Sequence, residues 1–421
     1  MLRRRMAGDP DRHLEKMTPN ADGRTMNETS LPYDVAVVGG GPAGLAAAIA
    51  LADTGARVAL VARRAAYADN RTTALLGGSV DFLERLDVWR RCAGQSADLT
   101  TMRLVDDTGR LIRAPEVKFV SAEIGLDTFG YNIANRDLMT ALEERAGELA
   151  NLTRIDDDAE TIRMGDNNVV VHMTQGASLS ARLVVGADGR QSLCRNAAGI
   201  EVKRRPLDQA ALTFNMSVGR PHHNTSTEFH TTSGPCVFVP LPGQRCSVVW
   251  VSTPKEAERL MALSDTELSA AAEKQSHSIF GRVSVEPGRY LFPLGIEQPK
   301  QVAKNRVVLV GESAHVVPPI GAQGLNMGLR DAGDIARIVG DAMASGEDIG
   351  GPTVLARFER ARRSDIASRT FAIDMANRSL LSDLLPVQLM RGIGMQLIGS
   401  VGPLRRVAMR EGLSPSWRKS S

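Results

Sequence analysis

The sequence YDVAVVGGGPAGLAAAIA, residues 33–50, decides the fold of this chain. Its first part, a short apolar run rich in β-branched residues, predicts a buried strand, and the alanine-rich run after it predicts a helix. Between them Gly39, Gly41 and Gly44 fit G-x-G-x-x-G in the strand-turn-helix setting of a dinucleotide site. In such a turn Gly39 allows a tight bend, Gly41 lets the backbone approach a pyrophosphate, and Gly44 lets helix and strand pack closely. We therefore predict a dinucleotide site, with a glycine-rich turn that binds nothing as the alternative.

The composition narrows the class of protein. The chain has 421 residues, 43% hydrophobic and 24% charged, which is enough for two domains with large cores. A net charge of +3 gives no reason to expect nucleic-acid binding. Four separated cysteines favour a reducing cytoplasm and argue against a disulfide framework or a zinc site: Cys92, Cys194, Cys236 and Cys246.

Residues 1–32 are polar, carry three consecutive arginines and lack the apolar core of a secretory signal. We expect a disordered leader there. No stretch of the sequence reaches the roughly 18 uncharged apolar residues that a membrane span requires.

The second strand of the expected βαβ unit, residues 56–61, departs from the dinucleotide-binding pattern. An acidic residue at its end usually accepts hydrogen bonds from the adenosine ribose, whereas this chain has Ala62 followed by Arg63 and Arg64. Either arginine could cover the adenine or reach a phosphate. A solvated loop is the alternative for both.

Further along the chain, patterns alternate between strands and helices. We expect helices at residues 79–90, 135–149 (with Asn135 as N-cap) and 326–343, and a helical C-terminal part over 352–413. Strands with turns are expected over 101–120 and 152–180, and a second buried strand ends at 182–189. Residues 207–300 predict a separate, largely antiparallel sheet that one helix, residues 265–275, interrupts.

Three motifs in this order resemble the class A flavoprotein aromatic monooxygenases, which have the para-hydroxybenzoate hydroxylase fold. Within that family the chain is similar to the ubiquinone-biosynthesis hydroxylases. The motifs are the turn at 39–44, the stretch 186–195 (GADGRQSLCR), and GESAH at 311–315 with Pro319 and QGLN at 323–326. The resemblance spans about residues 33–345.

The resemblance implies a fold class and a domain plan. The fold would be α/β, with a discontinuous FAD-binding Rossmann-like domain at 33–107, 131–202 and 300–345. An inserted antiparallel β-sheet substrate domain would comprise 108–130 and 203–299, and helices would form residues 346–421.

The resemblance also implies a set of site residues. Pro319 would line the oxygen side of the flavin ring, and the N-terminus of the helix at Asn326 would face the pyrimidine end of the flavin. Glu312 replaces the usual aspartate, Ala322 replaces a usual glycine, and Arg71 and Arg136 match family arginines near the cofactor. The residues expected to bind FAD are Gly39, Gly41, Ala43, Gly44, Arg63, Arg71, Arg136, Asp188, Gly189, Gly311, Glu312, Gly324, Leu325 and Asn326.

The chemistry implied is hydroxylation of a phenol ring through a flavin C(4a)-hydroperoxide, with NAD(P)H and O2 as co-substrates. The sequence has no second nucleotide-binding unit, and no base is assigned; we expect His315 to be packed or capped. No metal site is expected. Candidates for an apolar substrate wall, with sheet core as the alternative for each, are Phe214, Phe238, Val239, Pro240 and Leu241.

The C-terminal segment bears on a prenylated, lipid-like substrate. Residues 384–410 predict a helix with an apolar face (Leu385, Leu389, Ile393, Leu397, Val401, Leu404) and a basic flank. Such a helix could lie on the inner, cytoplasmic face of a membrane as a peripheral contact. Packing on the FAD-binding domain or in a dimer is the alternative.

Four functions remain open at this stage. The first is hydroxylation of a polyprenylated phenol in ubiquinone biosynthesis, within a biosynthetic complex in the cytoplasm. The second is the same chemistry on a soluble aromatic compound. The others are a non-catalytic FAD-binding subunit and a flavin-dependent reductase of isoprenoid double bonds.

Overall fold

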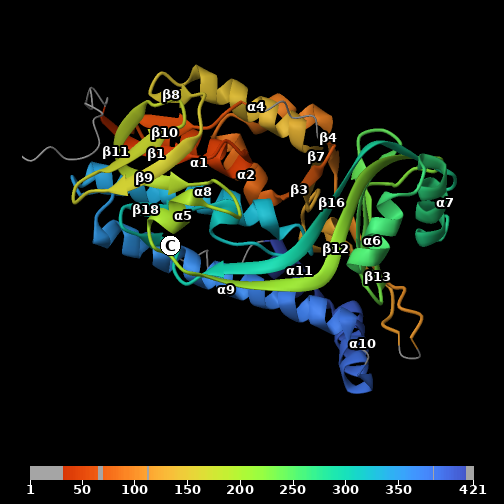
Figure 1. Cartoon of the computed structure of the whole chain (residues 1–421). Coiled ribbons are helices and arrows are strands. Elements are labelled where there is room, and N and C mark those ends of the chain that lie inside the picture. Colours follow the sequence, from red (N-terminus) through yellow and green to blue (C-terminus); the bar gives the residue numbers. More distant parts are fainter. Residues whose placement is uncertain (1–31, 65–69, 111–112, 383, 414–421) are drawn as a thin grey trace, which may run out of the picture.

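The computed structural model describes residues 32–64, 70–110, 113–382 and 384–413. The leader expected over residues 1–32 therefore lies outside the described residues, except for Pro32. The molecule has two parts side by side, a nucleotide-binding part and a large sheet, and a long helix runs beneath both (Figure 1).

The nucleotide-binding part is built on an eight-stranded sheet in the order β17-β18-β11-β1-β2-β8, extended by β10 on β11 and β9 on β10. The β1–β11, β1–β2, β2–β8 and β11–β18 pairs are parallel, and the β9, β10 and β17 pairs are antiparallel. The bounds are β1 Pro32–Val38, β2 Val58–Val61, β8 Leu152–Ile155, β9 Ala159–Met164, β10 Val169–Met173, β11 Ser178–Gly186, β17 Ala303–Lys304 and β18 Val307–Leu309.

Helices cover this sheet and complete its core. Helix α1 is buried along almost its whole length and packs against α4 and α8, because alanine side chains let the helices approach closely. The bounds are α1 Pro42–Asp53, α4 Asn135–Glu148, α5 Leu193–Ala197, α8 Gln323–Ala344 and the 3-10 turn η3 Gly311–Ser313. The predicted strand-turn-helix and the second parallel strand are confirmed.

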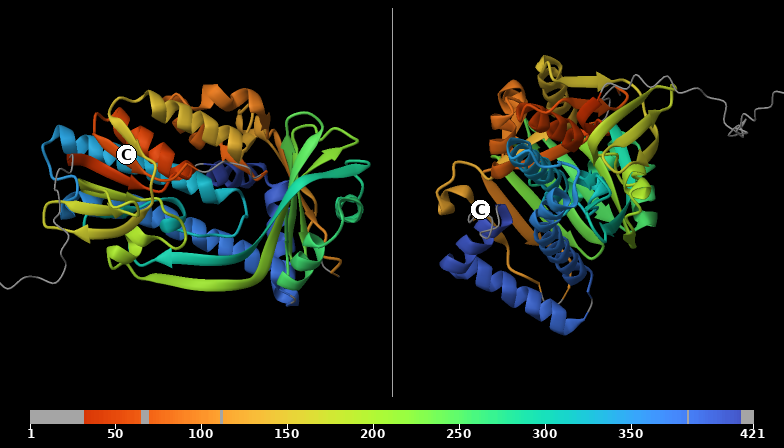
Figure 2. Two further views of the ribbon diagram at one scale, coloured as in Figure 1. Left: turned by 45° about the horizontal axis from the view of Figure 1, so that its top comes forward. Right: turned by 90° about the vertical axis from the view of Figure 1, so that its left-hand side faces the viewer.

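The second part is a seven-stranded sheet in the order β16-β12-β15-β14-β13-β5-β6. Helices α6 and α7 cover its outer face, and Figure 2 (left) shows the sheet with these helices on the side away from the nucleotide-binding part. The bounds are β5 Thr101–Asp106, β6 Val117–Val120, β12 Val202–Val218, β13 Thr225–Thr231, β14 Gly234–Leu241, β15 Arg245–Ser252, β16 Val283–Pro299, α6 Pro254–Met261 and α7 Asp265–Gln275.

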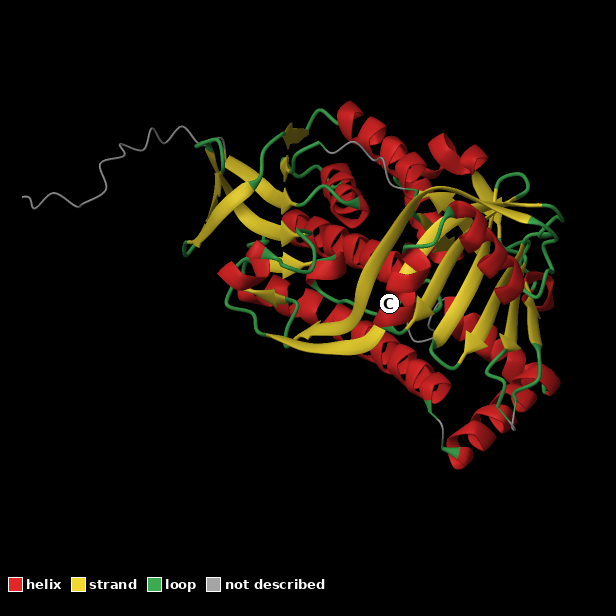
Figure 3. Ribbon diagram, turned by 45° about the vertical axis from the view of Figure 1, so that its right-hand side comes forward, coloured by secondary structure: helices red, strands yellow, loops and turns green. Residues whose placement is uncertain are grey.

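Two long strands join the two parts. Strands β12 and β16 pair antiparallel from Val202 opposite Pro299 to Val218 opposite Val283, with register shifts on the way. Figure 3 shows them curving out of the large sheet toward the nucleotide-binding part. A continuous strand pair rather than a flexible linker therefore fixes the position of the sheet relative to the nucleotide site.

Several sequence-based boundaries are wrong. The helix expected over 79–90 is two helices, α2 (Gly77–Arg85) and α3 (Trp89–Cys92), because Asp87 has a φ of 62° and breaks the run. A second helix, α6, interrupts the large sheet in addition to α7. Strand β5, which the sequence assigns to the FAD-binding domain, pairs in parallel with β13 of the large sheet.

A small sheet lies where the two parts meet. Its order is β3-β7-β4, and both pairs are antiparallel. The bounds are β3 Thr72–Leu76, β4 Ser96–Asp98, β7 Gly130–Ala134 and the 3-10 turns η1 Ala93–Gln95 and η2 Ser121–Ile124. Helix α4 follows β7 directly. Its N-cap is Ala134, without a side-chain cap, so the expected cap at Asn135 is wrong by one residue.

The C-terminal part is helical, as predicted: α9 Pro352–Leu381, α10 Leu385–Ser400 and α11 Gly402–Leu413. The first half of α9 shares the core of the nucleotide-binding part through buried Val354 and Phe358. Its second half reaches the large sheet, where Asn377 donates to the side chain of Gln209 at 2.8 Å. Helix α9 is therefore part of both halves of the molecule.

Candidate FAD site

The first turn leaves an open backbone at the start of α1. Gly39 has a φ of 112°, and a Cβ there would lie 2.3 Å from the carbonyl oxygen of Ala187. A Cβ on Gly44 would lie 2.0 Å from the oxygen of Gly39. Gly41, the N-cap, has no atom within 4 Å of such a Cβ. Gly39 and Gly44 are therefore required for packing, while Gly41 faces open space beside the free N–H groups of a helix N-terminus, a cradle suited to a pyrophosphate.

The second motif is held by its own side chains. Asp188 accepts hydrogen bonds from the Ser192 hydroxyl at 2.6 Å and from the Cys194 N–H at 3.0 Å. Arg195, 1% exposed, donates to the carbonyl oxygen of Ser313 at 3.1 Å. Asp188 thus stabilises the turn after β11, and Arg195 ties this turn to the third motif. Gly189 has a φ of 75° and open space above it.

The third motif adjoins the first. A Cβ on Gly311 would lie 3.1 Å from the Cβ of Ala43, so the two turns meet. Glu312 is exposed, and within the described part of the chain no hydrogen bond or ion pair engages its carboxylate. The structure therefore brings the three predicted turns together and leaves one carboxylate free at their meeting point.

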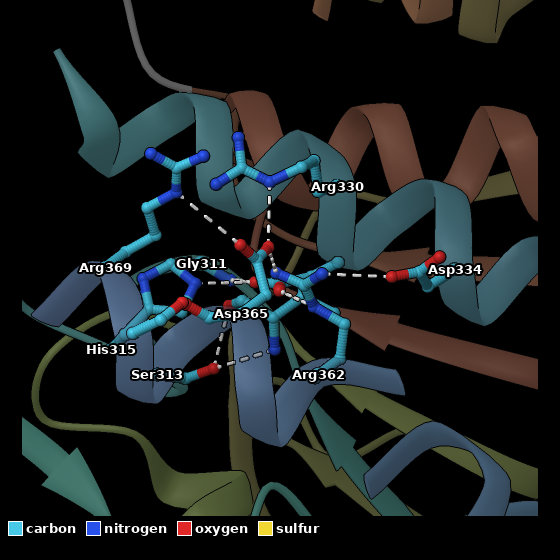
Figure 4. A network of polar contacts seen from close by, with 11 residues as sticks. Gly311, Ser313, His315, Arg330, Asp334, Arg362, Asp365 and Arg369 are labelled. Atoms are coloured by element: carbon cyan, nitrogen blue, oxygen red, sulfur yellow. Dashed lines mark hydrogen bonds and ion pairs between the residues drawn. The ribbon is translucent and has the colours of Figure 1, made fainter. Parts of the chain in front are cut away.

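A buried ionic network packs against the third motif (Figure 4). Asp331 of α8, fully buried, accepts from the Gly311 N–H at 2.9 Å and lies 2.7 Å from His315 Nε2. Arg362 of α9 donates to Asp331 at 2.6 Å and to Asp365 at 2.8 Å. Burial raises the pKa of Asp331, but the nearby His315 and Arg362 outweigh it, so the pKa lies below its ordinary value. His315 is thus packed and paired, as predicted.

The turn before α8 differs from the sequence-based expectation. Helix α8 begins at Gln323, three residues before the predicted Asn326, because Gly321 and Ala322 both take left-handed φ values, 64° and 54°. Asn326 lies inside the first turn of α8 and is fully buried. Its side chain accepts from the Leu76 N–H at 2.9 Å and donates to Ala74 O at 2.8 Å, which joins α8 to β3.

The helix N-terminus itself stays accessible. Gly324 is exposed, Leu325 is half-buried, and a Cβ on Gly324 would meet no atom within 4 Å. Pro319, half-buried, lies in the loop that leads to this N-terminus. Gly324 and Leu325 can offer backbone N–H groups to an anionic edge of a ring, whereas Pro319 has no N–H to donate.

The three predicted arginines do not meet at one point. Arg63 pairs with Asp158 at 2.9 Å, and Arg71 lies 5.8 Å from the centre of the Tyr290 ring. Arg136 is exposed and lines a cavity of about 270 Å³ together with Arg245. Tyr290, which sequence reasoning missed, gave no signal in the sequence because its position beside Arg71 depends on the pairing of β16 with β12.

The large sheet turns one face to the site and one to α6 and α7. Phe214 and Phe238 are fully buried on the face that α6 and α7 cover, so they do not line a substrate wall. In β14 Pro240 lies on that same face, and strand alternation puts Val239 and Leu241 on the opposite, inner face. On this face the Thr72 hydroxyl of β3 contacts Ser247 of β15 at 2.7 Å. Val239 and Leu241 therefore remain candidates.

Comparisons with known proteins agree with this geometry. The model of the FAD binding domain family matches residues 32–370. The chain is 31% identical over 420 residues to a ubiquinone hydroxylase, UbiL, of Rhodospirillum rubrum, covering 98% of this chain and 95% of that protein. It is 28% identical to the 3-demethoxyubiquinol 3-hydroxylase of Escherichia coli, covering 91% of this chain and 99% of that protein.

Solved structures share the fold. The p-nitrophenol 4-monooxygenase of Pseudomonas putida superposes with a TM-score of 0.75 at 20% identity, covering 91% of this chain and 98% of that one. A probable FAD-dependent monooxygenase of Pseudomonas aeruginosa gives 0.71 at 22% identity, covering 87% and 100%. The fold and the three convergent turns define a class A flavoprotein. The chain belongs to the FAD binding domain family, and its cofactor is FAD with NAD(P)H as co-substrate.

Proposed function

We propose that this protein hydroxylates the ring of a polyprenylated phenol in ubiquinone biosynthesis. The observation that carries the proposal is the 31% identity over 98% of the chain to a ubiquinone hydroxylase, together with three turns that leave Gly41, Gly189 and Gly324 open. When bound, FAD supplies oxygen activation, and NAD(P)H supplies its electrons.

The residues of this chain bind FAD, orient its flavin ring and shield that ring from water. The α1 N-terminus at Gly41 would hold the pyrophosphate, and the exposed Glu312 carboxylate would accept from hydroxyl groups of the flavin side chain. The N-terminus of α8 at Gly324 would donate N–H groups to an anionic edge of the flavin ring. Pro319 would offer shape without an N–H donor beside the ring. The inner face of the sheet, with Val239 and Leu241, would keep water from the ring.

A deletion strain of the source organism tests the proposal. Loss of the gene should lower the quinone and accumulate a prenylated precursor that lacks one ring hydroxyl. The wild-type gene should restore the quinone, while Gly41→Val, which fills the pyrophosphate cradle, should not. Normal quinone levels in the deletion strain would remove the proposal and leave hydroxylation of a soluble aromatic compound. Growth in ¹⁸O₂ separates the remaining alternatives, because only a hydroxylase adds labelled oxygen to the precursor, whereas a reductase or a non-catalytic subunit does not.

The substrate class requires access to a membrane, and we propose that α10 and α11 provide it on the cytoplasmic side. We define the C-terminal apolar surface as the exposed side chains Leu384, Leu389, Met390, Ile393, Leu397, Val401, Leu404 and Val407. Their exposed fractions run from 41% to 73%, and no acidic residue occurs between Asp383 and Glu411, while four arginines do. An apolar face with a basic flank suits an anionic lipid surface.

Contacts between α11 and the rest of the protein fix the position of the C-terminal apolar surface. Arg405 of α11 pairs with Glu123 of η2 at 2.6 Å, and α10 projects at the lower edge of the molecule (Figure 1). The side chain of Leu385, which also belongs to the predicted apolar face, lies outside what the structure describes. Among the described helices, none has the length and apolar content to cross a bilayer.

Vesicle flotation tests the membrane contact. The protein should float with vesicles of phosphatidylglycerol and phosphatidylcholine, and less with phosphatidylcholine alone. The double variant Ile393→Glu, Leu397→Glu should lose at least tenfold in binding. Met261→Glu is the matched control, because Met261 is an exposed apolar residue on α6, outside the C-terminal apolar surface. Equal flotation of the double variant and the control would refute the contact and favour a protein partner in a biosynthetic complex.

A further inference from the structure

The end of β2 lacks the acidic residue that usually binds the adenosine ribose of a dinucleotide. Ala62 stands there, 6% exposed, with its N–H bonded to the carbonyl oxygen of Ile155 at 3.1 Å. A ribose hydroxyl that loses water without gaining a protein partner weakens binding. The bound FAD therefore needs another polar partner at this point.

A guanidinium from the neighbouring strand lies beside this point. Arg154 of β8 places Nη2 3.3 Å from the carbonyl oxygen of Ala62 and 3.6 Å from the position that a Cβ would take on Gly40. Gly40 belongs to the first turn, so Arg154 spans the gap between that turn and the end of β2. Its side chain is 11% exposed.

Glu143 of α4 holds this guanidinium in place. Both of its carboxylate oxygens contact Nη1 of Arg154, at 2.6 and 2.7 Å. The carboxylate is 24% exposed and keeps acceptor capacity, and Arg154 Nη2, which faces Gly40, carries a second N–H besides the one directed at the Ala62 carbonyl oxygen. A ribose hydroxyl both donates and accepts, so it can use both members of the pair.

Of the two arginines that follow Ala62, Arg63 has its side chain paired elsewhere, and Arg64 is held through its backbone. Arg63 pairs with Asp158 and contacts the Thr174 hydroxyl at 3.3 Å, and the backbone N–H of Arg64 donates to Asp156 at 2.8 Å. They anchor the loop after β2 to the loop after β8. Glu143 and Arg154 thus form the charged pair that the structure places beside Ala62 and Gly40, at the end of β2.

We propose that the Glu143–Arg154 pair, supplied by α4 and β8, replaces the missing acidic residue of β2 and binds the hydroxyl groups of the adenosine ribose of FAD. In this arrangement the carboxylate comes from Glu143 of α4 instead of from β2. Its pairing with Arg154 orients it toward the end of β2. The pair positions the cofactor and touches no reacting atom.

The test compares FAD with an analogue whose adenosine ribose lacks both hydroxyls. Dissociation constants are measured by flavin fluorescence on apoprotein. The wild type should bind FAD about tenfold more tightly than the analogue, the loss expected for hydrogen bonds to a charged pair. Glu143→Gln should bind the two within threefold of each other. The ratio does not depend on the fraction of folded protein, so a loss of stability in the variant does not disturb it.

Glu144→Gln is the matched control, because Glu144 is the exposed neighbour on the same helix and loses the same charge. It should keep the wild-type ratio. The proposal is overturned if Glu143→Gln keeps the wild-type ratio, or if the wild type itself binds FAD and the analogue equally.

Discussion

Substitution of Arg362 by methionine tests whether the buried network stabilises the FAD site. Arg362 is fully buried between α8 and α9, and it contacts three carboxylates: Asp331 at 2.6 Å, Asp365 at 2.8 Å and Asp334 at 3.0 Å. Burial lowers the pKa of Arg362, but the three aspartates outweigh it and raise the pKa, so the side chain stays charged. Methionine is an unbranched side chain like arginine but carries no charge, so the substitution removes the ion pairs.

The expected loss in the free energy of unfolding follows from the buried aspartates that the substitution leaves without Arg362. Asp331 and Asp365 are both fully buried, and each would lose a charge-assisted hydrogen bond. Breaking a buried ion pair costs about 3–5 kcal/mol. Asp331 would keep His315 and the Gly311 N–H, and Asp365 would keep Arg330 at 2.8 Å, so we expect about 3 kcal/mol at pH 7. Because Asp331 binds Gly311, FAD affinity should fall as well.

Urea denaturation of the apoprotein measures the loss. Arg363→Met is the control, since Arg363 is the exposed neighbour on α9 and takes part in no ion pair among the described residues. Its cost should stay below about 0.5 kcal/mol. A loss below about 1 kcal/mol for Arg362→Met would show that the network adds nothing to stability and would refute the reasoning.

The pH dependence adds a second readout. A carboxylate whose folded pKa is lowered contributes stability above its ordinary value, 3.8 for Asp331, and loses that contribution as the pH falls through the folded pKa. Without Arg362 the pKa of Asp331 rises, so the variant loses less stability on acidification. The difference between wild type and variant should therefore shrink as the pH falls below about 3.8, where the carboxylate of the unfolded chain takes up its proton. A constant difference would contradict the assignment.

Three further predictions follow from local geometry. Gly41→Ala should weaken FAD binding at least tenfold without changing the melting temperature of the apoprotein, whereas Gly44→Ala should cost the apoprotein about 3 kcal/mol, because its Cβ would lie 2.0 Å from a backbone oxygen. Ala322→Gly should raise stability by about 0.5–1 kcal/mol in urea denaturation, because glycine takes the left-handed φ of 54° without strain. A thiol reagent at pH 8 should label none of the four cysteines until the protein unfolds, since all are buried and burial raises the pKa of Cys92 to about 11 and of Cys246 to about 12.

Each of these has an outcome that counts against it. Equal melting temperatures for Gly44→Ala and the wild type would contradict the close approach of the first turn. A lower urea midpoint for Ala322→Gly would show that the left-handed turn is not strained. Rapid labelling of the folded protein would show that at least one thiol is accessible.

Local signals predicted the nucleotide-binding part well. The turn at Gly39 and the second parallel strand are short-range patterns, and the structure has both. Helix α6 carried signals too, since Thr253 caps it and Pro254 occupies its first turn. The β-branched residues on both sides of it favoured a continuous sheet, so the helix was missed.

Long-range packing decided what the sequence could not. In β14 both faces are apolar, with Phe238 on one and Val239 on the other, so alternation alone does not tell which face α7 covers. Arg362 and Asp331 lie on different helices, and charged residues in a helical pattern suggest a solvated surface. Only the packing of α9 on α8 shows that these two are buried partners.

Helix α9 connects the features that matter for function. Its first half carries Arg362, which supports the third turn of the FAD site, and its second half bonds to the large sheet through Asn377. The sequence assigned residues 346–421 to one C-terminal unit, but α9 belongs with the FAD site while α10 and α11 lie beyond it. Because the C-terminal apolar surface shares no residue with the buried network, charge substitutions at Ile393 and Leu397 should change lipid binding and leave FAD affinity unchanged. The proposed membrane contact and flavin binding should thus be separable by mutation, although one continuous run of helices carries the residues assigned to both.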